Sequence, residues 1–189
     1  LFFKLIHFST DHMYDKNTEG SSSERAIPIV NNYYTKIKLI SERICLKNNA
    51  LVLRINFFGH SKKGITFSDW VLKKFRSKKQ FTLVNDVFFN PLSLNTISKI
   101  IFKIITKNLY KPGLFNLGSK DRISKKDFGI KFAKLSGVYK NNFEIKKIND
   151  ILSTKRSANM FMNVKKFEEN FLIKLPKLNS EMQKEIKIK

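Results

Sequence analysis

Residues 31–56 read NNYYTKIKLISERICLKNNALVLRIN and join two elements of different periodicity. The apolar residues of Asn31–Lys47 recur at helical spacing, whereas Ala50–Asn56 is a short continuous apolar run, as in a buried strand. A third element precedes both, since Leu1–Phe8 is another short apolar run of strand type. A strand, a helix and a second buried strand in this order predict a parallel sheet with crossover helices.

The alternation of strands and helices continues toward the C-terminus. Further helices are predicted at Thr66–Ser77, at Asn95–Asn108 with Asn95 as the N-cap, and from a Ser124-x-x-Asp127 capping box to about Leu135. Further strands are predicted at Phe81–Val84 and at Leu114–Leu117, the latter closed by Gly118. The fold class is therefore α/β with a mostly parallel sheet.

The elements become shorter after about Leu114, which indicates a small lobe that follows the main sheet. The stretch Glu19–Glu24 reads as a mobile loop, and the polar residues Asn179–Lys189 as a frayed helix or tail. The apolar start of the chain is too short for a signal peptide and reads as a strand entered midway.

The net charge of +22 raises the question of a polyanion partner. The basic residues are 31 Lys and only 6 Arg, and they are spread along the chain, whereas phosphate and base recognition favours the bidentate fork of Arg. A composition bias on an ordinary globular surface explains this better than specific nucleic-acid binding does. A polyanion-binding module remains the least favoured of the functional alternatives.

The cysteine and histidine content excludes other classes. Cys45 is the single cysteine, so an internal disulfide is excluded and a reducing compartment, the cytoplasm, is expected. His7, His12 and His60 are not spaced as ligand pairs, so no metal site is expected. The longest apolar runs are interrupted by charges, for instance by Lys103, so no membrane span is expected.

Glycine spacing gives no phosphate-binding loop. No two of the seven glycines form Gly-x-Gly, which removes the dinucleotide fingerprint. Gly59 and Gly64 have the spacing of a P-loop, but Ile65-Thr66 follows them in place of Lys-Ser/Thr.

Two short motifs could carry chemistry. Ser9-Thr-Asp11 follows the first strand, at the sheet edge where open α/β sheets bind ligands, although a helix cap or turn would use the same residues. Tyr34 and Lys38 are one helical turn apart, and a nearby ammonium lowers the pKa of a phenol toward the range of a general acid or base. A solvated face of a Lys-rich helix would explain the same pair.

Taken together and in order, these motifs resemble the extended short-chain dehydrogenase/reductases, in the branch of dTDP-4-dehydrorhamnose reductase and related sugar-nucleotide reductases. Residues 9–15 (STDHMYD) are similar to the family signature Ser-Thr-Asp-Tyr-Val-Phe-Asp, and residues 34–42 to its Tyr-Gly-x-x-Lys-x-x-x-Glu helix. Residues 86–91, 113–118 and 156–159 resemble three later family segments. The resemblance spans roughly Ile6–Glu169 and implies the C-terminal part of a Rossmann-type parallel sheet plus a small α/β substrate-binding lobe.

The resemblance also implies roles for individual residues. Thr10 would hydrogen-bond the substrate carbonyl, Tyr34 would deliver the proton, and Lys38 would hold the nicotinamide ribose and lower the pKa of Tyr34. Asn56, Phe57 and Phe58 would lie beside the nicotinamide of NADPH or NADH.

The implied substrate is a 4-keto deoxysugar nucleotide. Asp11 joins Thr10 as a substrate-binding residue, and Arg156 and Asn159 would lie near the nucleotide diphosphate, where Arg suits a bidentate phosphate contact. The implied division is a partial nucleotide-binding domain at residues 1–112 with substrate-lobe insertions, a stretch at 113–178 that is mainly substrate-binding lobe, and a polar tail at 179–189.

The departures from the family pattern keep alternatives open. The Gly-rich half that binds the dinucleotide is absent from this sequence, which implies that the fragment alone is inactive. Thr35 stands in place of a Gly and leaves Tyr33 as a rival to Tyr34, and Lys16 and Ser157 replace a Gly and a Pro. A nucleotide-sugar epimerase or dehydratase, a catalytically silent regulatory homologue and a homodimer all stay open.

Overall fold

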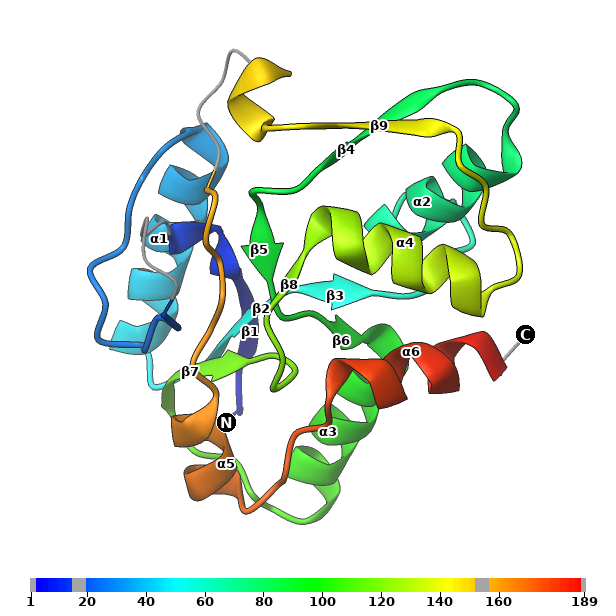
Figure 1. The fold of residues 1–189 in the computed structure, drawn as a ribbon. Helices are drawn as coiled ribbons and strands as arrows, with labels where there is room; N and C mark the ends of the chain where they lie inside the picture. Colours follow the sequence, from blue (N-terminus) through cyan, green and yellow to red (C-terminus); the bar gives the residue numbers. More distant parts are fainter. Residues whose placement is uncertain (1–2, 15–19, 152–156, 188–189) are drawn as a thin grey trace.

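The computed structural model describes residues 3–14, 20–151 and 157–187. Its main sheet has three parallel strands in the order β1-β2-β7, with β1 at Ile6–Thr10, β2 at Leu51–Ile55 and β7 at Gly113–Leu117. Helix α1 (Tyr33–Lys47) lies on one side of this sheet, and α3 (Leu94–Thr106) and α5 (Lys165–Phe171) lie on the other (Figure 1). The predicted α/β class with parallel strands is confirmed.

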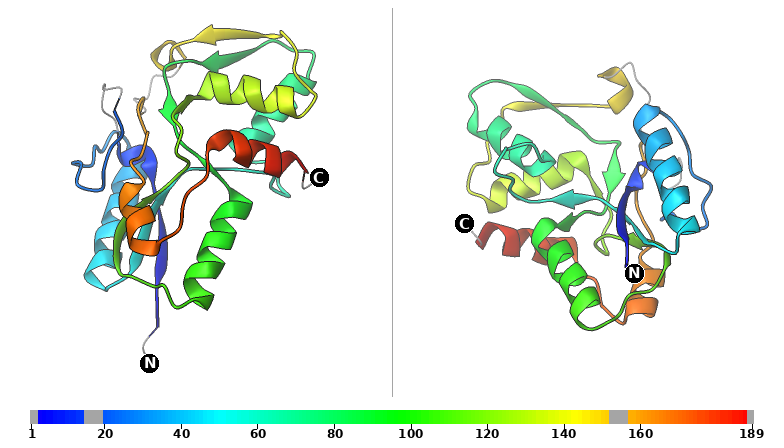
Figure 2. Two further views of the ribbon diagram at one scale, coloured as in Figure 1. Left: turned by 60° about the horizontal axis from the view of Figure 1, so that its bottom comes forward. Right: turned by 180° about the vertical axis from the view of Figure 1, so that it is seen from behind.

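The remaining elements form a second region beside the main sheet. Parallel strands β4 (Phe81–Val84) and β9 (Phe143–Lys146) lie next to helices α2 (Phe67–Arg76) and α4 (Lys125–Leu135), as both views in Figure 2 show. Short strand pairs connect the two regions: β3 (Phe57–Phe58) with β6 (Leu92–Ser93), and β5 (Phe88–Phe89) with β8 (Ile123–Ser124). The described residues also include two 3-10 turns, η1 (Asp11–Met13) and η2 (Ile148–Asp150).

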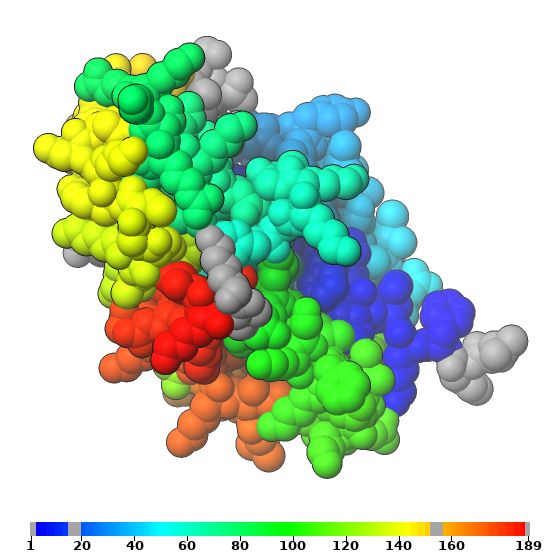
Figure 3. All heavy atoms as spheres, turned by 90° about the vertical axis from the view of Figure 1, so that its right-hand side faces the viewer, coloured from blue at the N-terminus to red at the C-terminus, as the bar shows by residue number. Residues whose placement is uncertain are grey.

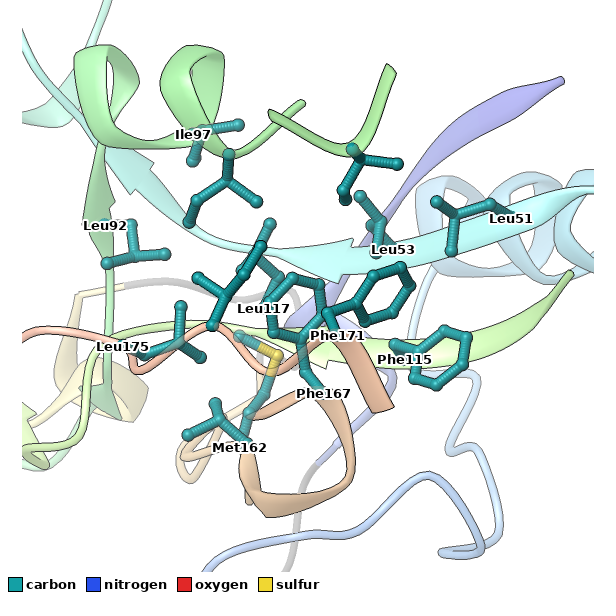
Figure 4. Packing of buried hydrophobic residues seen from close by; sticks show 14 of the residues in the cluster. Leu51, Leu53, Leu92, Ile97, Phe115, Leu117, Met162, Phe167, Phe171 and Leu175 are labelled. Atoms are coloured by element: carbon teal, nitrogen blue, oxygen red, sulfur yellow. The ribbon is translucent and has the colours of Figure 1, made fainter. Parts of the chain in front are cut away.

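The largest buried cluster lies between the main sheet and helices α3 and α5. Figure 4 shows Leu53 of β2 and Leu117 of β7 facing Ile97 of α3 and the stacked rings of Phe167 and Phe171. Two smaller, Phe-rich clusters fill the second region. Apolar burial on one side of the sheet therefore fixes the strands whose C-terminal ends carry the polar motifs.

Helix starts follow local capping chemistry. Ser124 caps α4 as predicted, with its hydroxyl oxygen accepting from the Asp127 N–H at 3.0 Å. The predicted N-cap Asn95 of α3 is wrong, because the side chain of Ser93 accepts from the Thr96 N–H and the helix starts at Leu94.

Two boundaries differ from the sequence prediction. Residues 113–117 add strand β7 to the main sheet, so the stretch assigned mainly to a substrate lobe also completes the sheet. The C-terminal stretch, expected to be a frayed helix or a tail, forms helix α6 (Leu178–Lys187), which is packed rather than frayed: it buries Leu178 and Met182 and lies between α4 and α3 (Figure 3). Leu178 and Met182 lie one helical turn apart, and burying two such apolar side chains stabilises the packing of a short polar helix. This spacing is difficult to recognise in a sequence so rich in lysine.

Candidate active site

The residues of the two sequence motifs meet in one cavity at the C-terminal ends of β1 and β2. The cavity has a volume of about 200 Å³, and its wall includes Thr10, Asp11, Tyr34, Lys38, Asn56 and Phe57. Parallel strands bring their carboxyl ends to one edge, which is where open α/β sheets bind ligands. The sheet thus places a hydroxyl, a carboxyl, a phenol and an ammonium around a common space.

Helix α1 supplies the phenol and the ammonium. Its first turn is fixed by a capping box in which the Asn32 side chain accepts from the Thr35 N–H at 3.0 Å and the Thr35 hydroxyl accepts from the Asn32 N–H at 3.3 Å. Lys38 Nζ donates to the carbonyl oxygen of Phe8 at 3.0 Å, which ties the helix to the end of β1. Tyr34 is half exposed at the cavity and Tyr33 does not line it, so the geometry favours Tyr34 over its rival.

Thr10 and His12 also line the cavity. Thr10 is buried at the end of β1 and caps η1, with its hydroxyl oxygen accepting from the His12 N–H at 3.2 Å. The His12 ring lies edge-on to the Tyr34 ring, with centroids 5.9 Å apart. The same short turn therefore presents a hydroxyl to the cavity and an aromatic contact to the phenol.

Asp11 is a buried carboxyl beside these groups. Burial raises its pKa to about 7, although the hydrogen bond from Asn56 and the charge of Lys125 both oppose that rise. Asn56 Nδ2 donates to Asp11 Oδ2 at 2.5 Å, so the carboxyl is held from the end of β2. A carboxyl with a pKa in this range can hold or release a proton near neutral pH.

A buried polar network lies behind the cavity. Glu42, two turns along α1 from Tyr34, accepts from Ser9 Oγ at 2.8 Å and from Arg54 Nε at 3.0 Å. Arg54 Nη1 also donates to the Tyr14 hydroxyl at 2.7 Å, and that hydroxyl donates to Asn116 Oδ1 at 2.7 Å. These bonds link α1 to β1, β2 and β7, the elements that carry the cavity residues.

The sequence matches the model of the RmlD substrate binding domain family over residues 3–188. The chain belongs to this family. The dTDP-4-dehydrorhamnose reductase of Shigella flexneri is 24% identical over 186 residues, which cover 91% of this chain and 61% of that protein. The chain thus spans about three fifths of the length of the curated relatives that it matches.

Solved structures share the Rossmann-like fold of this RmlD-family chain. A dTDP-4-dehydrorhamnose reductase from Clostridium acetobutylicum superposes with a TM-score of 0.85 at 17% identity, over 98% of this chain and 65% of that one. The reductase from Bacillus anthracis, in complex with NADP, gives 0.85 at 18% identity with the same coverage. A dTDP-glucose 4,6-dehydratase from B. anthracis, in complex with NAD, gives 0.79 at 17% identity over 97% and 60%.

Two of the predicted site residues in this RmlD-family chain, Phe58 and Asn159, lie away from the cavity. Phe58 is fully buried in the second region, edge-on to the rings of Phe128 and Phe132, because neighbouring strand residues point to opposite faces. Asn159 is buried and donates to the Gly20 carbonyl oxygen at 3.1 Å. Arg156 lies outside the described residues.

Sequence reasoning assigned no role to four residues that organise the site of this family member. The sequence gives a hint for three of them. His12 lies inside the first motif, Glu42 follows Lys38 by one helical turn, and Arg54 is a charged residue within an apolar strand. The fourth, Ser157, donates from its hydroxyl to the His12 carbonyl oxygen at 2.7 Å, a contact between residues far apart in sequence.

The described residues contain no group of three His, Cys, Asp or Glu side chains placed to hold a metal ion. In the same part of the chain, no helix is long and apolar enough to cross a membrane.

Proposed function

We propose that this chain is the acid/base and substrate-binding part of an NAD(P)-dependent reductase that acts on a 4-keto deoxysugar nucleotide. The observation that carries the proposal is the meeting of Thr10, Tyr34 and Lys38 around one cavity, in an RmlD-family fold. With this activity we place the protein in the cytoplasm, where its single cysteine, Cys45, would stay reduced.

The cavity wall fits one end of a nicotinamide cofactor. Lys38 contributes an ammonium that can donate to ribose hydroxyls, and Asn56 and Phe57 contribute an amide and a flat apolar ring to the lining of the same cavity. When bound, NADPH or NADH supplies the hydride that reduces the carbonyl carbon. Phe58 belongs to the buried core and is left out of this proposed contact.

The chain's own groups provide the proton and position the carbonyl. The Thr10 hydroxyl donates to the substrate carbonyl oxygen, and the Tyr34 phenol gives its proton to that oxygen as negative charge develops there. The Lys38 ammonium stabilises the phenolate that remains and is itself oriented by the Phe8 carbonyl. Asp11 contacts the sugar from the floor of the cavity.

Residues 113–178 form the proposed substrate lobe, with β7 serving both the lobe and the main sheet. Arg156 and Asn159 are proposed to serve the nucleotide diphosphate. The side chain of Asn159 donates to the Gly20 carbonyl oxygen, so Asn159 would act indirectly, by holding the backbone at Gly20 in place.

A chimera tests the proposal, because the chain spans only part of its relatives. The part of the B. anthracis reductase that this chain does not cover is joined to it, and oxidation of NADPH is followed with a dTDP-4-keto-6-deoxysugar. We expect turnover, and we expect Tyr34→Phe to lower kcat by about 10² to 10⁴ with KM nearly unchanged. Tyr33→Phe is the matched control and should leave kcat unchanged.

Equal turnover in the Tyr34→Phe and Tyr33→Phe chimeras would contradict the assignment. Saturation-transfer NMR of this chain alone with a dTDP-sugar provides a second measurement that needs no cofactor. Binding that Thr10→Val weakens is expected, and a dTDP-sugar that gives no signal would count against the substrate class.

One observation favours a second function, dehydration or epimerisation of a nucleotide sugar. The pKa of Asp11, raised by burial to about 7, gives the cavity an acid/base group in addition to Tyr34. Product analysis by NMR separates the two functions, because a reductase product carries a new C–H bond at the former carbonyl carbon. A dehydratase product has lost water and retains a carbonyl.

A further inference from the structure

Arg122, just before β8, holds its guanidinium over an aromatic ring. Arg122 Cζ lies 3.6 Å from the centroid of the Phe88 ring, which is a stacking distance for a cation on an aromatic face, and both side chains are partly exposed. Arg122 Nε is enclosed and has no hydrogen-bond partner among the described residues. Since enclosed donors are nearly always paired, this Nε–H indicates an acceptor that the described chain does not provide.

A second cation on the same strand pair serves as a comparison. β5 and β8 lie side by side between the main sheet and the second region (Figure 1). Lys125 Nζ, directly after β8, lies 5.7 Å from the centroid of the Phe89 ring, and its charge opposes the rise in the pKa of Asp11. Lys125 therefore acts on the candidate active site. Arg122 has no such counterpart, since none of the ion pairs in the described part of the chain involves it.

A short segment connects the cavity to the Arg122 stack. Ser157 donates from its hydroxyl to the carbonyl oxygen of His12, a residue that lines the cavity, at 2.7 Å. The next residue, Ala158, accepts from the Phe88 N–H at 2.7 Å. The cavity wall and the ring beneath Arg122 are therefore joined through two consecutive residues. A ligand with one end in the cavity can follow this segment and reach the guanidinium.

The chemistry of a stacked guanidinium indicates which ligand group fits. Its fork of N–H groups matches pairs of phosphate oxygens, and the ring beneath it fixes its plane before a ligand arrives. The segment that leads to Arg122 starts at the cavity proposed to hold a ketosugar. In a nucleotide sugar, the group attached to the sugar is a diphosphate. A phosphate is therefore the anion expected at Arg122.

We propose that Arg122, held in place by Phe88, binds a phosphate of the substrate's diphosphate beside residues 157–160. This inference rests on the proposed function, because it adds a residue to the nucleotide end of the same site. It provides a cation that Asn159 does not, since Asn159 is buried and donates to the Gly20 carbonyl oxygen. Arg122 then favours nucleotide sugars over free sugars, which carry no phosphate.

Inorganic pyrophosphate is the probe, because it presents a diphosphate without a nucleoside or a sugar. It is titrated into the nitrogen-15-labelled chain at about 0.15 M salt, and the Nε–H signals of the arginines are followed by NMR. The signal that is missing from the Arg122→Lys spectrum belongs to Arg122. We expect this signal to shift saturably. We expect Arg122→Gln to weaken binding about tenfold or more, measured on the backbone amide of Phe88.

Matched variants separate this contact from general charge and from folding. Arg43→Gln removes the same charge from an exposed arginine of α1 that does not line the cavity, and it should leave pyrophosphate binding unchanged. Arg122→Lys keeps the charge but not the fork, so it should recover only part of the affinity that Arg122→Gln loses. Circular dichroism compares the folds. If Arg122→Gln did not fold, Arg122→Lys would decide on its own, because it retains a cation over the ring.

Three results would overturn the proposal. They are an Arg122 Nε–H signal that pyrophosphate does not move, equal binding by the wild type and the Arg122 variants, and equal weakening by Arg43→Gln and Arg122→Gln. The first would assign the Nε–H to water. Turnover of the chimera plays no part in this test, so the two proposals can fail separately. A chimera without turnover would leave a saturable Arg122 shift standing, and turnover without that shift would refute only the role of Arg122.

Discussion

Arg54 and Glu42 form a buried ion pair, with Arg54 Nη2 2.5 Å from Glu42 Oε1 and both side chains almost fully enclosed. The pair joins β2, which ends at the cavity, to α1, which carries Tyr34 and Lys38. Removing one partner leaves an uncompensated charge in the interior, whose cost is set by lost solvation more than by the lost bond.

Arg54→Met should therefore lower the free energy of unfolding by about 3–5 kcal/mol. The Arg54→Met/Glu42→Met double variant should lose less than the sum of the two single changes, because neither charge is then left unpaired. Urea denaturation of the four proteins measures this cycle. Additive effects would show that the two charges do not depend on each other.

Asp11 predicts a pH dependence of stability. Burial raises its folded-state pKa from 3.8 to about 7, so between these values the unfolded chain releases a proton that the folded chain retains. Stability contributed by this group is full below pH 4, falls as the pH rises toward 7 and is then constant. The total loss is at most about 4 kcal/mol.

Asp11→Asn should remove this component, since the amide oxygen can still accept from Asn56 and no charge develops. The measurement is the difference in unfolding free energy between the wild type and the variant at several pH values. A difference that does not change between pH 4 and pH 8 would show that Asp11 titrates normally.

Gly118, which directly follows strand β7, predicts a steric effect on stability. A Cβ at this position would lie 2.6 Å from the carbonyl oxygen of Asn90, a fully buried residue whose side chain holds Met162 and Ser119. Gly118→Ala should therefore destabilise the fold by about 1–3 kcal/mol. Gly20→Ala is the control, because no atom lies within 4 Å of its added Cβ, and thermal unfolding compares the two. Equal melting temperatures of the two variants would mean that the backbone at Asn90 can shift to accommodate the added Cβ without cost.

The sequence predicted the sheet and the core of the site because both depend on local patterns. Continuous apolar runs identified β2, and the fixed spacing of Tyr34 and Lys38 on one helix face placed both at the cavity. Phe58 was not separable from Phe57 without knowing the twist of β3, and the docking of Met182 depends on contacts distant in sequence. A pattern within one helix or strand can be recognised in the sequence, whereas the residues that pack against that element cannot.

Thr35 departs from the family pattern, and its side chain stabilises the first turn of α1. The resemblance expects Gly here, but Thr35 is fully buried at the third position of α1 and exchanges hydrogen bonds with Asn32. Thr35→Gly should remove the hydrogen bond from the Asn32 N–H to the Thr35 hydroxyl. It should also raise the conformational entropy of the unfolded backbone, which disfavours folding. We expect a loss of about 1–2 kcal/mol in unfolding free energy.

Thr35→Ser separates the hydroxyl from the methyl group, because Ser retains the oxygen that accepts from the Asn32 N–H. It should recover most of the stability lost in Thr35→Gly, as measured by urea denaturation. Amide exchange of residues 33–36 provides the local readout, since fraying of this turn should appear in the Gly variant alone. Because Tyr34 lies in this turn, loss of the cap would also loosen the phenol at the cavity, and equal exchange rates in all three proteins would show that the cap does not hold it.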